Sequence, residues 1–153
     1  MLQLQDAGDG TTATLTLGPL ETITATGASA TIDSTTLNGE AVINDGTIIA
    51  AMAGASLAIT PLNFTNAGLL SVTDASLTIG YDDDYSGGVR GPWSNAGAIA
   101  LAGTASLNVD GAVATAGLGT ILNAAPRVRL SGVIRRASPT TAPQRWCKRP
   151  TNT

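Results

Sequence analysis

From Thr12 to Val109, apolar residues alternate with Thr, Ser and Asn, so that the hydrophobic pattern repeats every second residue. Such alternation is typical of β-strands with one buried face, whereas an amphipathic helix repeats every 3.6 residues. Ala13, Leu15 and Leu17 share one face of the first such segment, which Gly18-Pro19 ends. The pattern predicts an all-β chain without long helices.

One unit recurs along this region. Each copy has an apolar residue, then Asn-x-Gly, a short apolar alternation and finally Ala-Ser-Leu-x-Ile or Ala-Ser-Leu-x-Val, over residues 42–59, 64–79 and 93–109. Residues 21–33 form a degenerate fourth copy. Repeats of about 20 to 30 residues built from strands are typical of solenoids, in which each coil buries its apolar face against the next. We therefore expect a parallel β-solenoid over residues 12–125, with roughly 20 residues per coil and about five coils.

Alignment of the copies predicts which residues stack. Leu57, Leu77 and Leu107 should lie above one another. The preceding strand should place three pairs at equivalent inward positions: Ile48 with Ala50, Leu70 with Val72, and Ile99 with Leu101. Within each copy, length varies only between these strands and Ala-Ser-Leu, which indicates corners, because a one-residue slip inside a strand would turn its apolar face to water. A sandwich of hairpins with turns at Asn38-Gly39 and Asp45-Gly46 is the structural alternative.

The Asn-x-Gly segments are expected to be structural turns. Their residues are Asn44, Gly46, Asn66, Gly68, Asn95 and Gly97. Glycine would allow a positive φ at these turns, and an asparagine side chain can satisfy turn backbone groups. Stacked asparagines could also hydrogen-bond one another along the axis, as in cross-β ladders. The sequence leaves both roles open for the asparagines, and it aligns Phe64 with Trp93 as neighbours packed at one corner.

Charge divides the chain near residue 125. All eleven acidic residues precede residue 111, whereas seven of the eight basic residues lie between Arg127 and Arg149. Residues 1–11 are expected to form an N-terminal edge or weak cap. Residues 126–153 form a basic tail rich in Pro and Arg, which we expect to be disordered because it cannot bury enough apolar surface.

The tail interrupts the repeat. An unchanged repeat would bury Arg127 and Arg129, which is prohibitive for unpaired charges. The solenoid therefore either slips by one residue, placing Val128 and Leu130 inward, or ends near Ala125. A shifted reading frame would explain the change of composition as well as a functional tail would. No nucleic-acid partner is expected, since no aromatic reading surface accompanies the basic residues, and no membrane contact is expected either.

Three segments carry a family resemblance: Asn44-Asp45-Gly46-Thr47-Ile48, Asn66-Ala67-Gly68-Leu69-Leu70 and Asn95-Ala96-Gly97-Ala98-Ile99. They resemble the β-strand repeats of large bacterial surface adhesins and autotransporter passengers, which wind a right-handed parallel β-helix. The resemblance covers residues 20–125. It implies a non-enzymatic structural or adhesive segment of a larger secreted protein, located outside the cell or on the outer membrane. Neighbouring repeats of the same polypeptide, and a host or environmental surface or glycan, would be its partners. The first six residues lack the basic and apolar regions of a secretory signal.

Few residues suit catalysis. The chain has no histidine, which excludes Ser-His-Asp and Cys-His nucleophile systems and most zinc sites. Asp82, Asp83 and Asp84 lie in the longest interruption between two copies, where carboxylates could bind calcium, although their spacing is not that of an EF-hand. A solvated polar loop is the alternative, and no other cofactor is expected.

An enzyme alternative uses the same loop. A β-helix polysaccharide lyase or hydrolase could combine a loop carboxylate with Asp74 or Asp110 as general acid and base. Such enzymes line a groove with basic and aromatic side chains, yet this chain has five aromatic residues and only Arg90 before residue 127. We therefore expect a protein that is not an enzyme.

Overall fold

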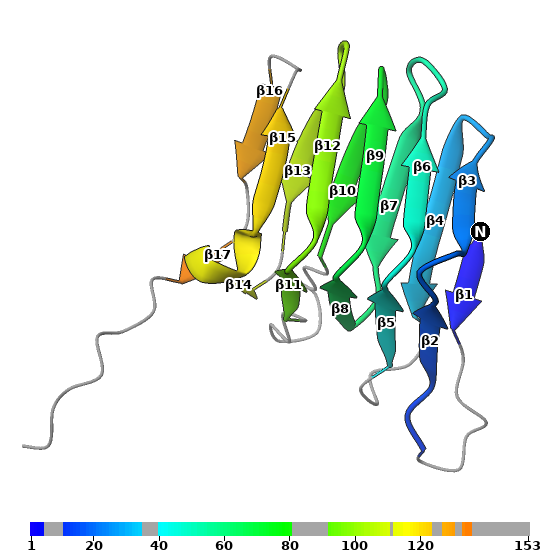
Figure 1. Cartoon of the computed structure of the whole chain (residues 1–153), viewed down its shortest axis with the longest axis vertical. Coiled ribbons are helices and arrows are strands. Elements are labelled where there is room, and N and C mark those ends of the chain that lie inside the picture. Colours follow the sequence, from blue (N-terminus) through cyan, green and yellow to red (C-terminus); the bar gives the residue numbers. More distant parts are fainter. Residues whose placement is uncertain are drawn as a thin grey trace, which may run out of the picture.

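The computed structural model describes residues 1–4, 11–34, 40–80, 92–110, 112–123, 127–130 and 133–135 (Figure 1). Regular structure in this part is β-strand, apart from the short 3-10 helix η1 (Thr115–Leu118). No helix among these residues is long and apolar enough to cross a membrane.

The strands form three larger sheets and one pair, and every pairing among them is parallel. Sheet A contains β1 (Leu2–Leu4), β4 (Ser29–Ser34), β7 (Ser56–Thr60), β10 (Ser76–Ile79), β13 (Ser106–Val109) and β16 (Arg127–Leu130). Sheet B contains β2 (Thr14–Leu17), β5 (Ala41–Asn44), β8 (Asn63–Asn66) and β11 (Trp93–Asn95). Sheet C contains β3 (Thr22–Ala25), β6 (Thr47–Ala50), β9 (Leu69–Thr73), β12 (Ala98–Ala102) and β15 (Thr120–Asn123). Sheet D pairs β14 (Ala112–Ala114) with β17 (Val133–Arg135).

The chain visits the sheets in a fixed order. From β2 to β13 it runs through sheets B, C and A in turn, and each strand from β2 to β10 pairs with the strand three places later. Figure 1 shows the strands of sheet C in front of those of sheet A, with the shorter strands of sheet B below. The predicted all-β, parallel, solenoid-like architecture is confirmed. The hairpin sandwich is wrong, because the paired strands among the described residues are parallel rather than antiparallel.

The predicted columns of buried residues are confirmed. Leu77 is the register partner of both Leu57 and Leu107. On sheet C, Leu70 lies between Ile48 and Ile99, and Val72 lies between Ala50 and Leu101. None of these side chains exposes more than 3% of its surface. Full burial of a Leu, Ile or Val side chain contributes about 1.5–3 kcal/mol, so these columns supply much of the stability of the stack.

The expected positive φ at Gly46, Gly68 and Gly97 is wrong. In the described residues, the glycines with positive φ are Gly54, Gly80, Gly103 and Gly119. Successive Asn-x-Gly turns instead pass so close to one another that a side chain has no room. A Cβ atom on Gly68 would overlap the carbonyl oxygen of Gly46, and one on Gly97 would overlap that of Gly68. Glycine is required at these turns for clearance and not for torsional freedom.

The repeat slips by one residue at its C-terminal side, as one of the two alternatives predicted. Strand β16 pairs with β13 so that Val128 lies opposite Leu107 and Leu130 lies opposite Val109. Arg127 and Arg129 therefore take the register positions of Ser106 and Asn108, which alternate with the buried ones. Strand pairing continues into the segment assigned to the basic tail, as far as Arg135. Residues 136–153 lie outside the described part.

We expect Gly68→Ala to destabilise the protein by about 1–3 kcal/mol, the usual cost of overpacking, because the added methyl group meets backbone that cannot rotate away. Gly27→Ala is the matched control, since a Cβ atom there would be 3.6 Å from its nearest neighbour and the residue is exposed. Urea denaturation followed by circular dichroism measures both. Equal unfolding free energies for the two variants would contradict the clearance argument.

Candidate functional site

The predicted calcium ligands Asp82, Asp83 and Asp84 lie outside the described residues. Within the part that is described, no cluster of three or more acidic or cysteine side chains is placed to hold a metal ion. The residues predicted as structural turns are all described, and the structure brings their asparagines together.

The asparagines form a buried ladder along the stack. The Nδ2 atom of Asn44 donates to Oδ1 of Asn66 at 2.6 Å, and Nδ2 of Asn66 donates to Oδ1 of Asn95 at 2.7 Å. Asn44 and Asn66 are fully buried, and Asn95 exposes 2% of its surface. Both roles left open by the sequence are adopted, since Nδ2 of Asn66 also donates to the carbonyl oxygen of Gly68 in its own turn, at 3.4 Å. Buried amides that satisfy one another stabilise a single register, because a slipped turn would leave them unpaired.

The ladder ends differently on its two sides. Nδ2 of Asn95 donates to the carbonyl oxygens of Leu118 and Thr120, at 2.9 and 3.3 Å. On the other side, Oδ1 of Asn44 is buried without a hydrogen-bond partner. Leu17 is the register partner of Asn44, and its side chain has no hydrogen-bond donor. The ladder thus ends on backbone at one side and on an unsatisfied acceptor at the other.

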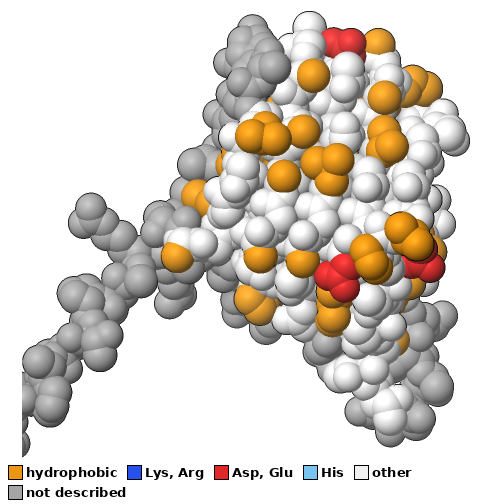
Figure 2. Space-filling model, in the orientation of Figure 1, with side chains coloured by type: hydrophobic (Ala, Val, Ile, Leu, Met, Phe, Trp, Pro, Cys, Tyr) orange, Lys and Arg blue, Asp and Glu red, His pale blue; other side chains and the backbone are white. Residues whose placement is uncertain are grey.

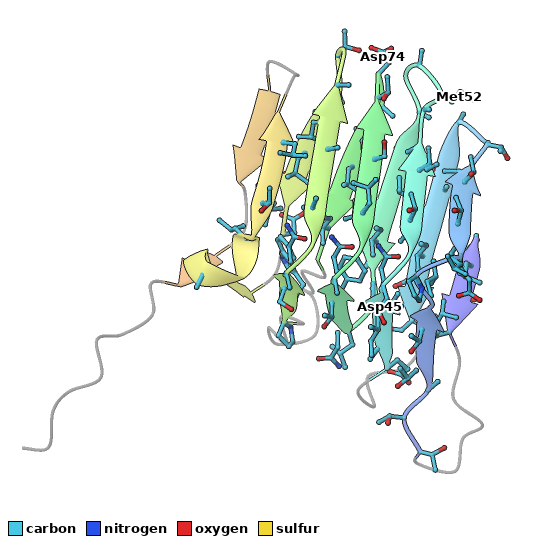
Figure 3. All side chains as sticks on the ribbon, in the orientation of Figure 1. Asp45, Met52 and Asp74 are labelled. Carbon is cyan, nitrogen blue, oxygen red and sulfur yellow. The ribbon has the colours of Figure 1, made fainter. Side chains whose placement is uncertain are left out.

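Asp74 holds a corner between sheets C and A. Its φ of 54° is the only positive value for a non-glycine residue in the described part, and Gly54 and Gly103 take positive φ at the neighbouring corners. Oδ1 of Asp74 accepts hydrogen bonds from the backbone N and Oγ1 of Thr104, at 2.8 and 3.2 Å. Figure 3 shows Asp74 at the same end of the sheets as Met52, with Asp45 toward the other end. This carboxylate therefore links two turns of the stack.

Asp74 and Asp110 do not form a pair. Asp74 precedes β10 and Asp110 follows β13, and these two strands pair in register over four residues. At about 3.3 Å per residue, a strand of that length spans about 13 Å, and Asp74 and Asp110 lie beyond its opposite ends. The two carboxylates of glycosidases lie about 5–9.5 Å apart. A combination of either residue with the loop carboxylates falls outside the described residues.

Trp93 is buried and cannot serve as an exposed platform for a sugar. It lies opposite Phe64 in register, and the two side chains expose 4% and 2% of their surfaces. The indole Nε1 donates to the carbonyl oxygen of Asp110 at 3.1 Å. The expected packing of Phe64 against Trp93 at neighbouring turns is confirmed.

The outward faces of the stack consist largely of small side chains, with Ile49, Leu69 and Leu122 as larger ones on sheet C. On sheet A, the serine of each Ala-Ser motif forms a register column: Ser29, Ser56, Ser76 and Ser106. The strands of sheet C contain no charged residue. Figure 2 shows apolar side chains scattered over this face, with acidic side chains near its margins. A shallow depression of about 420 Å³ lies on it beside Ser71, Thr73, Ala100 and the half-exposed Leu122.

Sequence reasoning missed Glu40. Its side chain is fully buried, and neither carboxylate oxygen has a hydrogen-bond partner. Its backbone oxygen accepts from the backbone N of Asn63 at 3.0 Å. The alternation contains the signal that could have found it, because Glu40 lies two residues before the inward Val42 and so shares its face. The serine column was also missed, although the Ala-Ser-Leu motif contains it.

No family model matches the chain, and neither a curated protein nor a solved structure matches it.

We expect Asn66→Ala to destabilise the fold by about 2–4 kcal/mol, because it leaves Asn95 Oδ1 without its donor and Asn44 Nδ2 without its nearest acceptor. Asn44→Ala is the matched control at the end of the ladder. It breaks one interasparagine bond instead of two and removes the unsatisfied Oδ1 atom, so the loss should be about half as large. Urea unfolding provides both values, and an equal or larger loss for Asn44→Ala would contradict the ladder as described.

For Asp74, we expect Asn to be tolerated and Ala to cost about 1–2 kcal/mol. Asparagine adopts positive φ readily and retains an oxygen acceptor for Thr104, whereas alanine loses both properties. Thermal unfolding of Asp74→Asn and Asp74→Ala compares them. If Asp74→Asn were the more destabilising of the two, the carboxylate charge and not the corner geometry would be the essential feature.

Proposed function

We propose that this chain is a non-enzymatic structural and adhesive repeat segment of a secreted or cell-surface bacterial protein, part of a larger adhesin-like polypeptide. The observation that carries this proposal is the continuity of the same buried positions from turn to turn. The leucine column and the asparagine ladder both run through successive turns without a change of residue type. Such continuity suits a rod, whose task is to extend and to present surface.

The finer architecture belongs to the same proposal. We take the stack to be a right-handed β-helix of about five coils, with three strands in each coil. Adjacent strands in a sheet lie about 4.8 Å apart, so five coils give a rod of about 25 Å. The repeated passage through sheets B, C and A supports this arrangement.

The outward faces support an adhesive role. A column of serine hydroxyls on sheet A is repeated at the strand spacing of about 4.8 Å. The outward positions of sheet C carry uncharged side chains, which are mostly threonine, serine and alanine but include Ile49, Leu69 and Leu122. A surface of hydroxyl and alkyl groups suits contact with another extended, uncharged surface, such as a polysaccharide. The partner we propose is therefore a host or environmental surface or glycan.

An in-register deletion separates a structural segment from an enzyme. Removing residues 63–91 joins Leu62 to Pro92 and deletes one whole turn together with the Asp82–Asp84 loop. Because Trp93 is the register partner of Phe64 and Phe64 that of Val42, Trp93 would then stack on Val42, and Asn95 on Asn44. We expect the shortened protein to keep its β-rich circular dichroism spectrum and cooperative unfolding.

The control carries Trp93→Asp in the same shortened protein, which places an unpaired charge at the inward position that stacks on Val42 and should prevent folding. Both proteins and the intact chain are then incubated with a panel of polysaccharides, and new reducing ends and unsaturated products are measured. We expect neither product from the intact chain. Cleavage by the intact chain that the in-register deletion abolishes would refute the structural proposal and support the polysaccharide-active enzyme.

A further inference from the structure

One end of the stack contains an apolar depression of about 400 Å³. Its walls come from β1, β3 and β4. The lining includes Met1, Leu2, Ile23, Ala30 and Ile32. Met1 exposes 80% of its surface and Leu2 40%, although Leu2 is the register partner of the buried Ile32. Apolar groups therefore meet solvent at this end, where the stack is incompletely covered.

The uncovered place at this end of the stack is that of one strand beside β3. On sheet A, β1 lies beside β4, so this sheet extends one strand further than its neighbour. Sheet C ends at β3, with no described strand on its outer side. Ile23 and Ala25 are only half-buried, whereas their register partners Ile48 and Ala50 expose 0% and 1%. The difference in burial marks a place beside β3 that no described strand fills.

The surroundings define what could fill this place. Sheet C is parallel throughout, so the added segment would run parallel to β3. Inward positions in sheet C are the second and fourth of each strand, as Leu70 and Val72 are in β9. The segment would therefore need apolar side chains at these two positions and small or polar ones between them.

We propose that this end of sheet C is a strand acceptor, which takes the sheet-C strand of a neighbouring repeat of the chain's own pattern. The inference deepens the proposed function and rests on it, since a larger rod is what supplies such a repeat. A strand added here extends sheet C, which already runs from β3 to β15, by one strand. Its inward side chains fill the depression.

A second copy of this chain fits less well. The free sheet-C edge of a second copy is that of β15, whose register partners lead through β12, β9 and β6 to β3. If β15 of the second copy paired with β3, the β16 strand that follows it would need the place beside β4. That place is already taken by β1. The acceptor therefore suits a strand that leads into β1 instead of competing with it.

The test attaches such a strand to the full chain. The nine residues 69–77, Leu-Leu-Ser-Val-Thr-Asp-Ala-Ser-Leu, are fused directly before Met1. Leu2 shares a register column with Ile32, Ile59 and Ile79, so the fused copy of Leu77 takes the correct position two residues before Leu2. The fused copy of Leu69 then lies opposite Thr22. The control carries Leu70→Ser and Val72→Ser within the fused segment only.

We expect the fusion to raise the melting temperature by roughly 5–10 °C, because two more aliphatic side chains are buried. Hydrogen exchange of the β3 amides should slow by about tenfold or more, and the control fusion should show neither effect. Equal behaviour of the fused, control and unmodified proteins would overturn the acceptor, and so would equal stabilisation by the control. An unmodified chain that is dimeric in sedimentation, with β3 already protected, would show that a second copy is the occupant and overturn the neighbouring repeat. Because the in-register deletion measures the rod-like repeat separately, a folded deletion protein with an ineffective fusion would reject the acceptor alone.

Discussion

The structure depends on the close approach of one turn's backbone to that of the next. Gly46, Gly68 and Gly97 leave no space for a side chain between successive Asn-x-Gly turns. At that separation, the amide of one asparagine reaches the oxygen of the next at 2.6 to 2.7 Å. The glycines thus set the spacing and the asparagines use it, and the aliphatic columns on sheets A and C then meet in register. A change that widened the spacing would weaken all three features together.

A core built in this way is layered and has no centre. Each buried residue meets its equivalents in the turns on either side, as Leu77 meets Leu57 and Leu107. Bulky aromatic residues are scarcely needed, because small aliphatic side chains fill a narrow interior. Phe64 and Trp93 are the exceptions, and they occupy neighbouring positions in one column. Since contacts run mainly between neighbouring turns, the energetics resemble a row of coupled units more than a single globule.

The sequence was informative where residue types recur from copy to copy, and less informative where backbone geometry determines the role of a residue. Period-two alternation and the Ala-Ser-Leu motif predicted the strands and their register, because a slip would expose an apolar face. The predicted role of the turn glycines was wrong. A glycine needed for a positive φ and a glycine needed for close approach of two backbones look the same in a sequence. The role of the asparagines could not be decided for a similar reason, because an asparagine in a turn and an asparagine in a ladder look the same in a sequence. The corner conformation of Asp74 had no signal, as the aligned corners differ in length. Glu40 had a signal in its parity with Val42, but a carboxylate in an inward position contradicts the usual expectation for burial.

The orientation of the asparagine ladder gives the stack a chemical direction. Every interasparagine bond runs from the Nδ2 atom of the earlier turn to the Oδ1 atom of the later one. The amide dipoles therefore add along the axis. The ladder begins with an acceptor that has no hydrogen-bond partner, Oδ1 of Asn44, and ends with a donor bonded to backbone carbonyls, Nδ2 of Asn95. A stack with such polarity distinguishes head from tail at the level of single atoms. Both ends of the ladder are buried within the stack, so this direction is an internal property of the turns that the ladder joins.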